Sequence, residues 1–151
     1  MTTRASASKI PLPAAAAGAL LLGGDLEVSR MGFGAMRITG DGIWGPPPDV
    51  EAALTVLKRA QALGVNFIDT ADAYGPNVSE ELIHQALHPY PAGFVVTTKG
   101  GMTRQGPNRW AANCRPDHLR QACDASLQRL GIERHELYQL HAVDSKVPYA
   151  E

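Results

Sequence analysis

Four side chains that can move protons or carry charge follow short apolar segments of the chain. Asp69, Lys99 and His141 each close such a segment, and Tyr74 lies a few residues after Asp69 in a Tyr-Gly-Pro turn. If the segments are neighbouring parallel strands, these groups meet at one edge of a sheet, where α/β folds bind their ligands. A carboxylate, an ammonium, an imidazole and a phenol at one site suit proton-coupled reduction of a carbonyl group.

The phenol of Tyr74 is the predicted proton donor. A phenol's ordinary pKa, roughly 10, is too high for reversible proton exchange near neutrality. A neighbouring ammonium stabilises the phenolate and lowers that pKa, and Lys99 is the available ammonium. Asp69 would hold Lys99 in place and charged, while His141 would orient the substrate oxygen or share in the proton relay. None of these groups supplies a hydride, so a nicotinamide cofactor is expected.

A metal-dependent hydrolase is a second interpretation of the same residues. Its ligands would be His141, Asp69 and either His84 or His88. The ammonium of Lys99 argues against it, because a cation is costly beside a metal ion, and no His-x-His pair is present. His84 and His88 also fall toward the end of their helix that faces away from the expected site. We therefore predict no metal site.

The segments that would position these residues alternate between strand-like and helix-like patterns. Asp49, Asn77 and Ser79 are candidate helix N-caps, Pro116 suits a first helical turn, and Gly64 suits a helix stop. A Gly-Gly turn joins two short apolar segments near the N-terminus, as in a β-hairpin. The predicted strands cover 19–22, 26–29, 31–36, 65–69, 94–99 and 137–141, and the predicted helices cover 50–63, 78–88 and 116–130.

Near-continuous apolar strands that alternate with helices indicate a parallel sheet covered by helices. An open doubly wound sheet and an eight-fold barrel both satisfy this pattern. The nearest sequence to the dinucleotide-binding fingerprint of the open sheet is Gly32-Phe33-Gly34, which lacks the third glycine. Periodicity alone leaves the two architectures open.

Composition narrows the class of protein further. The 151 residues are 44% hydrophobic and 19% charged, with a formal net charge of −1. This composition excludes disorder and gives no basic surplus for nucleic acid. The two cysteines form no disulfide framework, which favours a cytoplasmic location. Residues 1–18 are expected to be a flexible leader, and the apolar run over 14–22 is too short to cross a bilayer.

Several motifs together resemble those of the aldo-keto reductase family. The similarity begins near Leu20 and continues to the last residue. Within the family, the sequence most resembles a bacterial branch that includes pyridoxal reductases and carries a Gly-Pro-Pro loop after the first strand. The motifs are Gly-Phe-Gly-Ala-Met-Arg over 32–37, Phe-Ile-Asp-Thr-Ala-Asp-Ala-Tyr-Gly over 67–75, Ser-Glu-Glu-Leu-Ile over 79–83, Val-Val-Thr-Thr-Lys over 95–99, Ser-Leu-Gln-Arg-Leu-Gly over 126–131 and Leu-His over 140–141.

The resemblance implies a parallel (β/α) barrel of the TIM type and an NADPH-dependent reduction of aldehydes and ketones to alcohols, with pyridoxal as one candidate substrate. It makes Tyr74 the general acid, assisted by Lys99, Asp69 and His141. It also places Ala35 and Met36, with Asp69, beside the nicotinamide. In the family, loops that here carry Trp44 and Trp110 line the substrate pocket.

A complete barrel of this kind takes about 250 residues, so residues 19–151 are expected to form about its first half, after a short N-terminal hairpin. In the family, most groups that grip the cofactor lie in the other half. We therefore expect a truncated form with weak cofactor binding and little turnover. A non-catalytic nicotinamide-binding barrel and an inactive fragment are the alternatives. The open edges of a half barrel would also favour self-association.

Overall fold

The computed structural model describes residues 12–148. Its centre is a parallel sheet of four strands in the order β3-β4-β5-β8. The parallel arrangement confirms the α/β class predicted from the sequence. The carboxyl ends of all four strands therefore meet at one edge of the sheet. The strands are β3 (Phe33–Gly34), β4 (Phe67–Asp69), β5 (Val95–Gly100) and β8 (Tyr138–Leu140).

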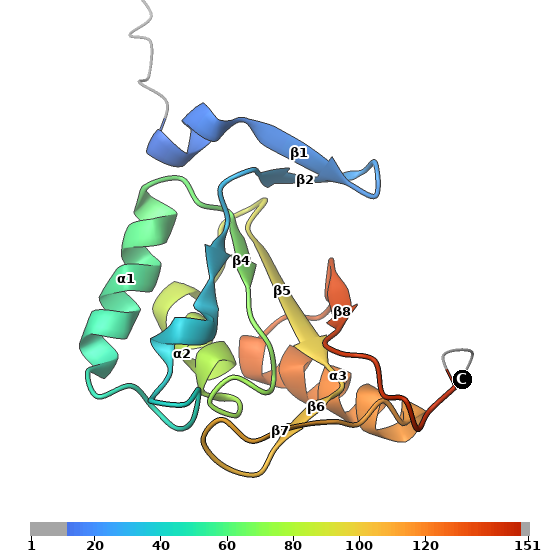
Figure 1. Cartoon of the computed structure of the whole chain (residues 1–151). Helices are drawn as coiled ribbons and strands as arrows, with labels where there is room; N and C mark the ends of the chain where they lie inside the picture. The colour runs from blue at the N-terminus through green and yellow to red at the C-terminus, as the bar shows by residue number, and fades with distance from the viewer. Residues whose placement is uncertain (1–11, 149–151) are drawn as a thin grey trace, which may run out of the picture.

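Three helices pack against the sheet within the described residues: α1 (Val50–Ala62), α2 (Val78–Leu87) and α3 (Pro116–Leu130). Figure 1 shows them together on one side of the sheet. The core lies between the two layers, because the apolar stripe of each helix faces the strands. Its fully buried members include Leu57, Ile68, Ile83 and Leu130.

The predicted helix boundaries depend on local capping. The Asp49 side chain accepts a hydrogen bond of 2.8 Å from the backbone N–H of Ala52, as expected for an N-cap. Of the two predicted caps of α2, Asn77 occupies the N-cap position but forms no side-chain cap bond, and Ser79 is not a cap. Asn77 precedes the helix in a left-handed conformation. Ser79 lies inside the helix, and its hydroxyl instead bonds with Thr70 at 2.7 Å and donates to the carbonyl of Ala35 at 3.1 Å.

The N-terminal hairpin is confirmed, with β1 (Ala19–Leu22) antiparallel to β2 (Leu26–Ser29). It lies at the end of the sheet where β4 and β5 begin (Figure 1). The flexible leader expected over 1–18 does not extend over 13–17, where the chain is ordered. A 3-10 helix, η1 (Pro13–Ala17), buries Ala14, whose N–H bonds the Leu63 carbonyl at 2.9 Å. Residues 1–11 lie outside the described residues.

Two further segments differ from the prediction. The strand expected over 31–36 is limited to β3, because the chain turns into a 3-10 helix, η2 (Ala35–Ile38), that buries Ala35 and Ile38. An unpredicted antiparallel hairpin, β6 (Met102–Arg104) and β7 (Trp110–Ala112), follows β5. Alternating polarity is hard to detect in three-residue strands, which explains the omission.

A charged pair is buried between α2 and α3. The Glu80 side chain is fully buried, and one of its oxygens accepts a hydrogen bond of 2.6 Å from Arg129 Nε. Its other oxygen accepts one of 2.6 Å from the hydroxyl of Thr98 on β5. Arg129 also donates to Ser126 Oγ at 3.1 Å. A buried carboxylate needs such partners, so this group links both helices to the sheet.

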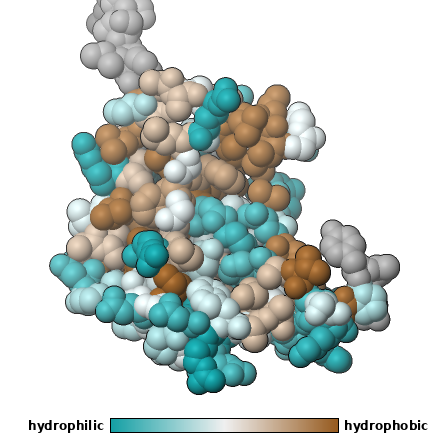
Figure 2. All heavy atoms as spheres, in the orientation of Figure 1, coloured by the Kyte–Doolittle hydropathy of each residue, from teal (hydrophilic) through white to brown (hydrophobic). Residues whose placement is uncertain are grey.

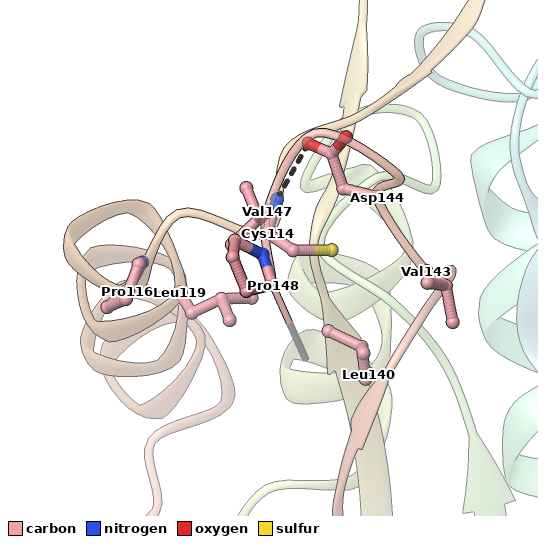
Figure 3. Close-up of a pocket in the computed structure, with 8 residues that line it drawn as sticks. All are labelled: Cys114, Pro116, Leu119, Leu140, Val143, Asp144, Val147 and Pro148. Carbon is pink, nitrogen blue, oxygen red and sulfur yellow. Dashed lines mark hydrogen bonds between the residues drawn. The ribbon is translucent and has the colours of Figure 1, made fainter. Parts of the chain in front are cut away.

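The sheet has two edge strands within residues 12–148, β3 and β8. Beside β8, an apolar groove of about 320 Å³ lies between α3 and the segment that follows the strand, with Leu140 and Val143 along it (Figure 3). Val143 is 70% exposed and Leu140 is 42% exposed. Figure 2 shows hydrophobic atoms on this segment and on the β1–β2 hairpin. None of the helices in this stretch is long and apolar enough to cross a membrane.

We expect the purified 151-residue chain to self-associate. A second copy would carry the complementary β3 edge, beside which Met31 and Val56 are 54% and 46% exposed. Light scattering should show a mass that rises with concentration, and Val143→Lys should shift the equilibrium toward the monomer. Val143→Ile serves as the matched control. A monomer at every concentration would count against this expectation.

Candidate active site

The predicted polar residues do meet at the carboxyl ends of the strands. Lys99 on β5 donates a hydrogen bond of 2.7 Å to Asp69 Oδ2, at the end of β4, and one of 3.3 Å to the Tyr74 hydroxyl. It also donates to the Thr70 carbonyl at 2.8 Å. The lysine side chain is only 14% exposed. The ammonium is therefore held by three acceptors, with the phenol among them.

The turn after β4 positions Tyr74. The tyrosine is buried, and its ring lies edge-on to the rings of His141, with centroids 5.5 Å apart, and Trp110, with centroids 6.4 Å apart. Gly75 has a φ of +100°, which other residues rarely adopt, so a glycine is needed for the chain to turn there. We call Asp69, Tyr74, Lys99, Trp110 and His141 the mouth.

Gln139, which the sequence did not indicate as a site residue, binds the second carboxylate oxygen of Asp69. Gln139 Nε2 on β8 donates to Asp69 Oδ1 at 3.2 Å and to Thr97 Oγ1 at 3.0 Å. Both oxygens of Asp69 are thus bonded, one to Lys99 and one to Gln139. The signal in the sequence was a single polar residue between apolar neighbours in a short strand, where it points to the face opposite theirs.

His141 directly follows β8, and its backbone N–H bonds the Gly100 carbonyl at 2.8 Å. Its Nδ1 atom is buried and has no hydrogen-bond partner among residues 12–148. Burial, together with the charge of Lys99, lowers the pKa of His141 below its ordinary value of 6.5. The imidazole is therefore neutral near pH 7 and has one nitrogen able to accept a hydrogen bond and one able to donate.

We predict that His141 titrates below pH 6.5 in an NMR pH series. Lys99→Met should raise its pKa, because the lysine charge is removed and the carboxylate of Asp69 remains. Since the folded state holds the proton more weakly than the unfolded state, His141 should lower stability as the pH falls below 6.5. An unchanged His141 pKa in Lys99→Met would contradict the arrangement of charges described here.

The other predicted site residues divide into contacting and supporting positions. Met36 packs against the cluster that contains Tyr74, and Trp110 joins the mouth from β7 rather than from a loop. Ala35 does not fit a cofactor-contacting role, because it is fully buried and its carbonyl accepts from Ser79. Trp44 lies farther out, 37% exposed, with the Arg104 guanidinium 5.8 Å from its ring.

Of the candidate metal ligands, Asp69 and His141 lie at the mouth, but His84 and His88 do not. His84 and His88 stack on each other near the end of α2, with ring centroids 4.5 Å apart. The Nδ1 atom of His84 lies 3.1 Å from the Leu130 carbonyl. Between residues 12 and 148, no three His, Cys, Asp or Glu side chains are grouped so that they could hold a metal ion.

A second carboxyl group lies in the turn that carries Tyr74. Asp72 Oδ1 is buried without a hydrogen-bond partner in the described part of the chain. Burial raises the pKa of Asp72 to about 7, and the charge of Glu80 adds to the effect. Its backbone holds the turn, with the N–H bonded to the Lys99 carbonyl at 3.2 Å and the carbonyl bonded to Asn77 N–H at 2.8 Å.

We predict that Asp72→Asn stabilises the chain most above pH 7, where the wild-type carboxylate is charged and buried. As the pH falls from 7 toward 3.8, the folded wild type takes up a proton that the unfolded chain does not, so the wild type gains stability. The advantage of the variant should therefore shrink over that range. Urea unfolding at several pH values measures this, with the exposed Asp41→Asn as control. An advantage that grows with acid would contradict it.

The mouth fits one end of a nicotinamide dinucleotide better than its phosphates. Asp69 is 38% exposed, and the unpartnered Nδ1 of His141 offers a free polar atom. Lys99 at the mouth is engaged by Asp69, and the neighbouring Arg104 is engaged by backbone carbonyls. The mouth thus brings together groups that are chemically able to exchange protons, whereas a pyrophosphate would need donors other than Lys99 and Arg104.

Comparison with known proteins identifies the family. Residues 30–151 match the sequence model of the Aldo/keto reductase family. The chain belongs to the aldo/keto reductase family. This confirms the resemblance recognised in the motifs.

Two curated relatives of this aldo/keto reductase chain are oxidoreductases. An uncharacterized oxidoreductase of Schizosaccharomyces pombe is 55% identical over 125 residues, which cover 83% of this chain and 40% of the relative. Pyridoxine 4-dehydrogenase of Escherichia coli is 40% identical over 120 residues, which cover 80% of this chain and 42% of the relative. The chain therefore spans about two fifths of the length of these relatives.

The chain also matches about two fifths of the length of solved aldo-keto reductase structures. Glycerol dehydrogenase from Gluconobacter oxydans superposes with a TM-score of 0.76 at 33% identity, covering 88% of this chain and 42% of that one. A holo aldo-keto reductase from Bacillus halodurans gives a TM-score of 0.71 at 30% identity, covering 84% and 40%. The parallel sheet and its helices are thus part of an α/β barrel, as predicted.

Proposed function

We propose that this chain carries the proton-transfer half of an NADPH-dependent carbonyl reductase, which reduces aldehydes and ketones to alcohols. The observation that supports it most directly is the contact of Lys99 Nζ with both the Asp69 carboxylate, at 2.7 Å, and the Tyr74 hydroxyl, at 3.3 Å. A solvated surface lysine would have no such partners. Pyridoxal is a candidate substrate, since a curated relative is a pyridoxine 4-dehydrogenase.

In the proposed reaction Tyr74 gives its hydroxyl proton to the carbonyl oxygen of the substrate. The Lys99 ammonium, anchored by Asp69, stabilises the phenolate that remains. The neutral His141, whose ring lies 5.5 Å from that of Tyr74, donates a hydrogen bond that orients the same oxygen. When bound, reduced nicotinamide supplies the hydride, so that one C–H bond and one O–H bond replace the carbonyl π bond.

The walls of the mouth fit a planar or small apolar carbonyl substrate. Trp110 stands edge-on to both Tyr74 and His141, with ring centroids 6.4 Å and 6.2 Å away. Trp44 extends this wall toward solvent, and Met36 and Asp69 line the side proposed for the nicotinamide. The two free cysteines, Cys114 and Cys123, support a reducing compartment, and we propose the cytoplasm.

The isolated 151-residue chain is proposed to bind NADPH weakly and to turn over slowly, because Lys99 and the nearby Arg104 are both engaged by other partners. The test therefore joins this chain to the remaining C-terminal segment of the Schizosaccharomyces pombe relative, which is 55% identical where they match. NADPH oxidation is followed with pyridoxal, simple aldehydes and ketones, and compared with NADH. The isolated chain and the C-terminal segment alone are the controls.

Oxidation of NADPH that depends on an added carbonyl, with alcohol as the product, is the expected result. Tight NADPH binding without oxidation by any carbonyl would show a non-catalytic nicotinamide-binding barrel instead. A folded joined protein that neither binds nor oxidises NADPH would overturn the proposal.

A further inference from the structure

A single arginine outside the proposed catalytic group connects three of the segments around the mouth. This residue is Arg104, at the end of β6. No sequence pattern indicates its role, because an arginine in a Gly-rich and Pro-rich loop is usually exposed to solvent. Its five N–H donors meet five backbone carbonyls at 2.7 to 3.4 Å. The acceptors are Ile43 and Ala73 for Nη1, Gly42 and Gly106 for Nη2, and Arg109 for Nε.

These carbonyls come from three separate stretches of the chain. Gly42 and Ile43 belong to the loop after η2, Ala73 directly precedes Tyr74, and Gly106 and Arg109 belong to the β6–β7 turn. The loop and the Tyr74 turn are joined again by the Gly75 N–H, which bonds the Ile43 carbonyl at 3.3 Å. The guanidinium thus connects the loop that carries Trp44, the turn that carries Tyr74 and the β6–β7 hairpin that carries Trp110.

The face of the same guanidinium packs between the tryptophans. Arg104 Cζ lies 3.5 Å from the ring centroid of Trp110 and 5.8 Å from that of Trp44. Trp110 in turn contacts Tyr74 and His141 edge-on. Arginine suits this position because it is planar, stacks on aromatic rings and offers five donors in a fixed fork.

We propose that Arg104 is a positioning residue: it holds the Tyr74 turn and the Trp110 ring as one rigid unit, and so sets the placement of the phenol over the substrate. The proposal rests on the proposed carbonyl reduction for its effect on rate. It also excludes Arg104 as an anion-binding group, because no N–H remains for a phosphate or a carboxylate. Lysine cannot replace it, since an ammonium has three donors and no planar face.

The first test uses the 151-residue chain and needs no activity. Trp44 and Trp110 are its only tryptophans, so fluorescence reports on this cluster alone. In Arg104→Lys we expect acrylamide to quench the tryptophans several-fold more strongly, while far-UV circular dichroism is unchanged. Arg109→Lys is the matched control in the same hairpin, because its side chain makes no hydrogen bond within residues 12–148. Equal quenching in Arg104→Lys and wild type would overturn the proposal.

The second test uses the joined reductase. Arg104→Lys should lower kcat for aldehyde reduction by about 10- to 100-fold, because small displacements of a reacting group reduce the rate by that order. The KM for NADPH should stay within about twofold, because Arg104 binds no phosphate in this account. An unchanged kcat, or a loss confined to the KM for NADPH, would overturn the proposal. If the joined wild type is inactive, the proposed function fails while the fluorescence test still decides the role of Arg104.

A third measurement covers the case in which Arg104→Lys does not fold. In the wild-type chain, NMR at low temperature should show separate, slowly exchanging resonances for the Nη protons of Arg104, because all of them are hydrogen-bonded. Averaged Nη signals, as given by a freely rotating guanidinium, would contradict the proposal that Arg104 is held rigidly by the backbone carbonyls.

Discussion

Tyr74→Phe in the joined reductase should lower kcat for aldehyde reduction by about 10²- to 10⁴-fold, the range that a general acid contributes. The substitution removes only the hydroxyl, so the edge-on packing against His141 and Trp110 stays. The KM for NADPH should change little, because the loss concerns a group that acts in the transition state. Initial rates at saturating cofactor and aldehyde give both constants.

Tyr90→Phe is the matched control for this prediction. The Tyr90 hydroxyl donates a hydrogen bond of 2.8 Å to the Leu130 carbonyl, on the helix side of the sheet and away from the mouth. Its loss should lower thermal stability and leave kcat unchanged. If Tyr74→Phe reduces NADPH-dependent turnover no more than Tyr90→Phe does, Tyr74 is not the proton donor.

Of the variants proposed for this chain, Arg129→Met should lose the most stability, about 3–5 kcal/mol in the free energy of unfolding. The carboxylate of Glu80 is fully buried, and Arg129 Nε lies 2.6 Å from it, so the variant leaves a buried charge without its counter-ion. A loss of this size is a large part of the net stability of an ordinary domain. Urea denaturation followed by circular dichroism measures it.

Two further variants separate the buried charge from a general loss of packing. Adding Glu80→Gln to Arg129→Met removes the unpaired charge and should recover part of the lost stability. Arg134→Met breaks the Arg134–Glu136 pair, whose side chains are 77% and 43% exposed, and should leave the unfolding midpoint almost unchanged. Equal losses in Arg129→Met and Arg134→Met would contradict the role given to the buried pair.

The sequence contained enough to predict the α/β class and the convergence of the main site residues. Apolar runs that end in Asp69, Lys99 and His141 mark strand ends, and parallel strands must bring such ends to one edge. The turn motif placed Tyr74 close to Asp69 in the chain, and the structure brings its hydroxyl to Lys99. The choice of a barrel over an open sheet depended on the family resemblance rather than on periodicity.

The remaining features depend on contacts between distant segments, which periodicity does not report. Gln139 bonds Asp69 across 70 positions, and Arg104 bonds Gly42 across 62. Ser79 looked like a helix cap, because serine near a helix start usually is one. Its actual partners, Thr70 and Ala35, become visible only when α2 is packed on the sheet.

The central claim is that Tyr74 and Lys99 act as one proton-transfer unit, and a double-mutant cycle in the joined reductase tests it most directly. The kcat/KM for one aldehyde is measured for wild type, Tyr74→Phe, Lys99→Met and the double variant. We predict that the double variant is within about threefold of Tyr74→Phe alone, because the lysine acts through the phenol. Losses that multiply, as expected for two independent groups, would contradict the claim.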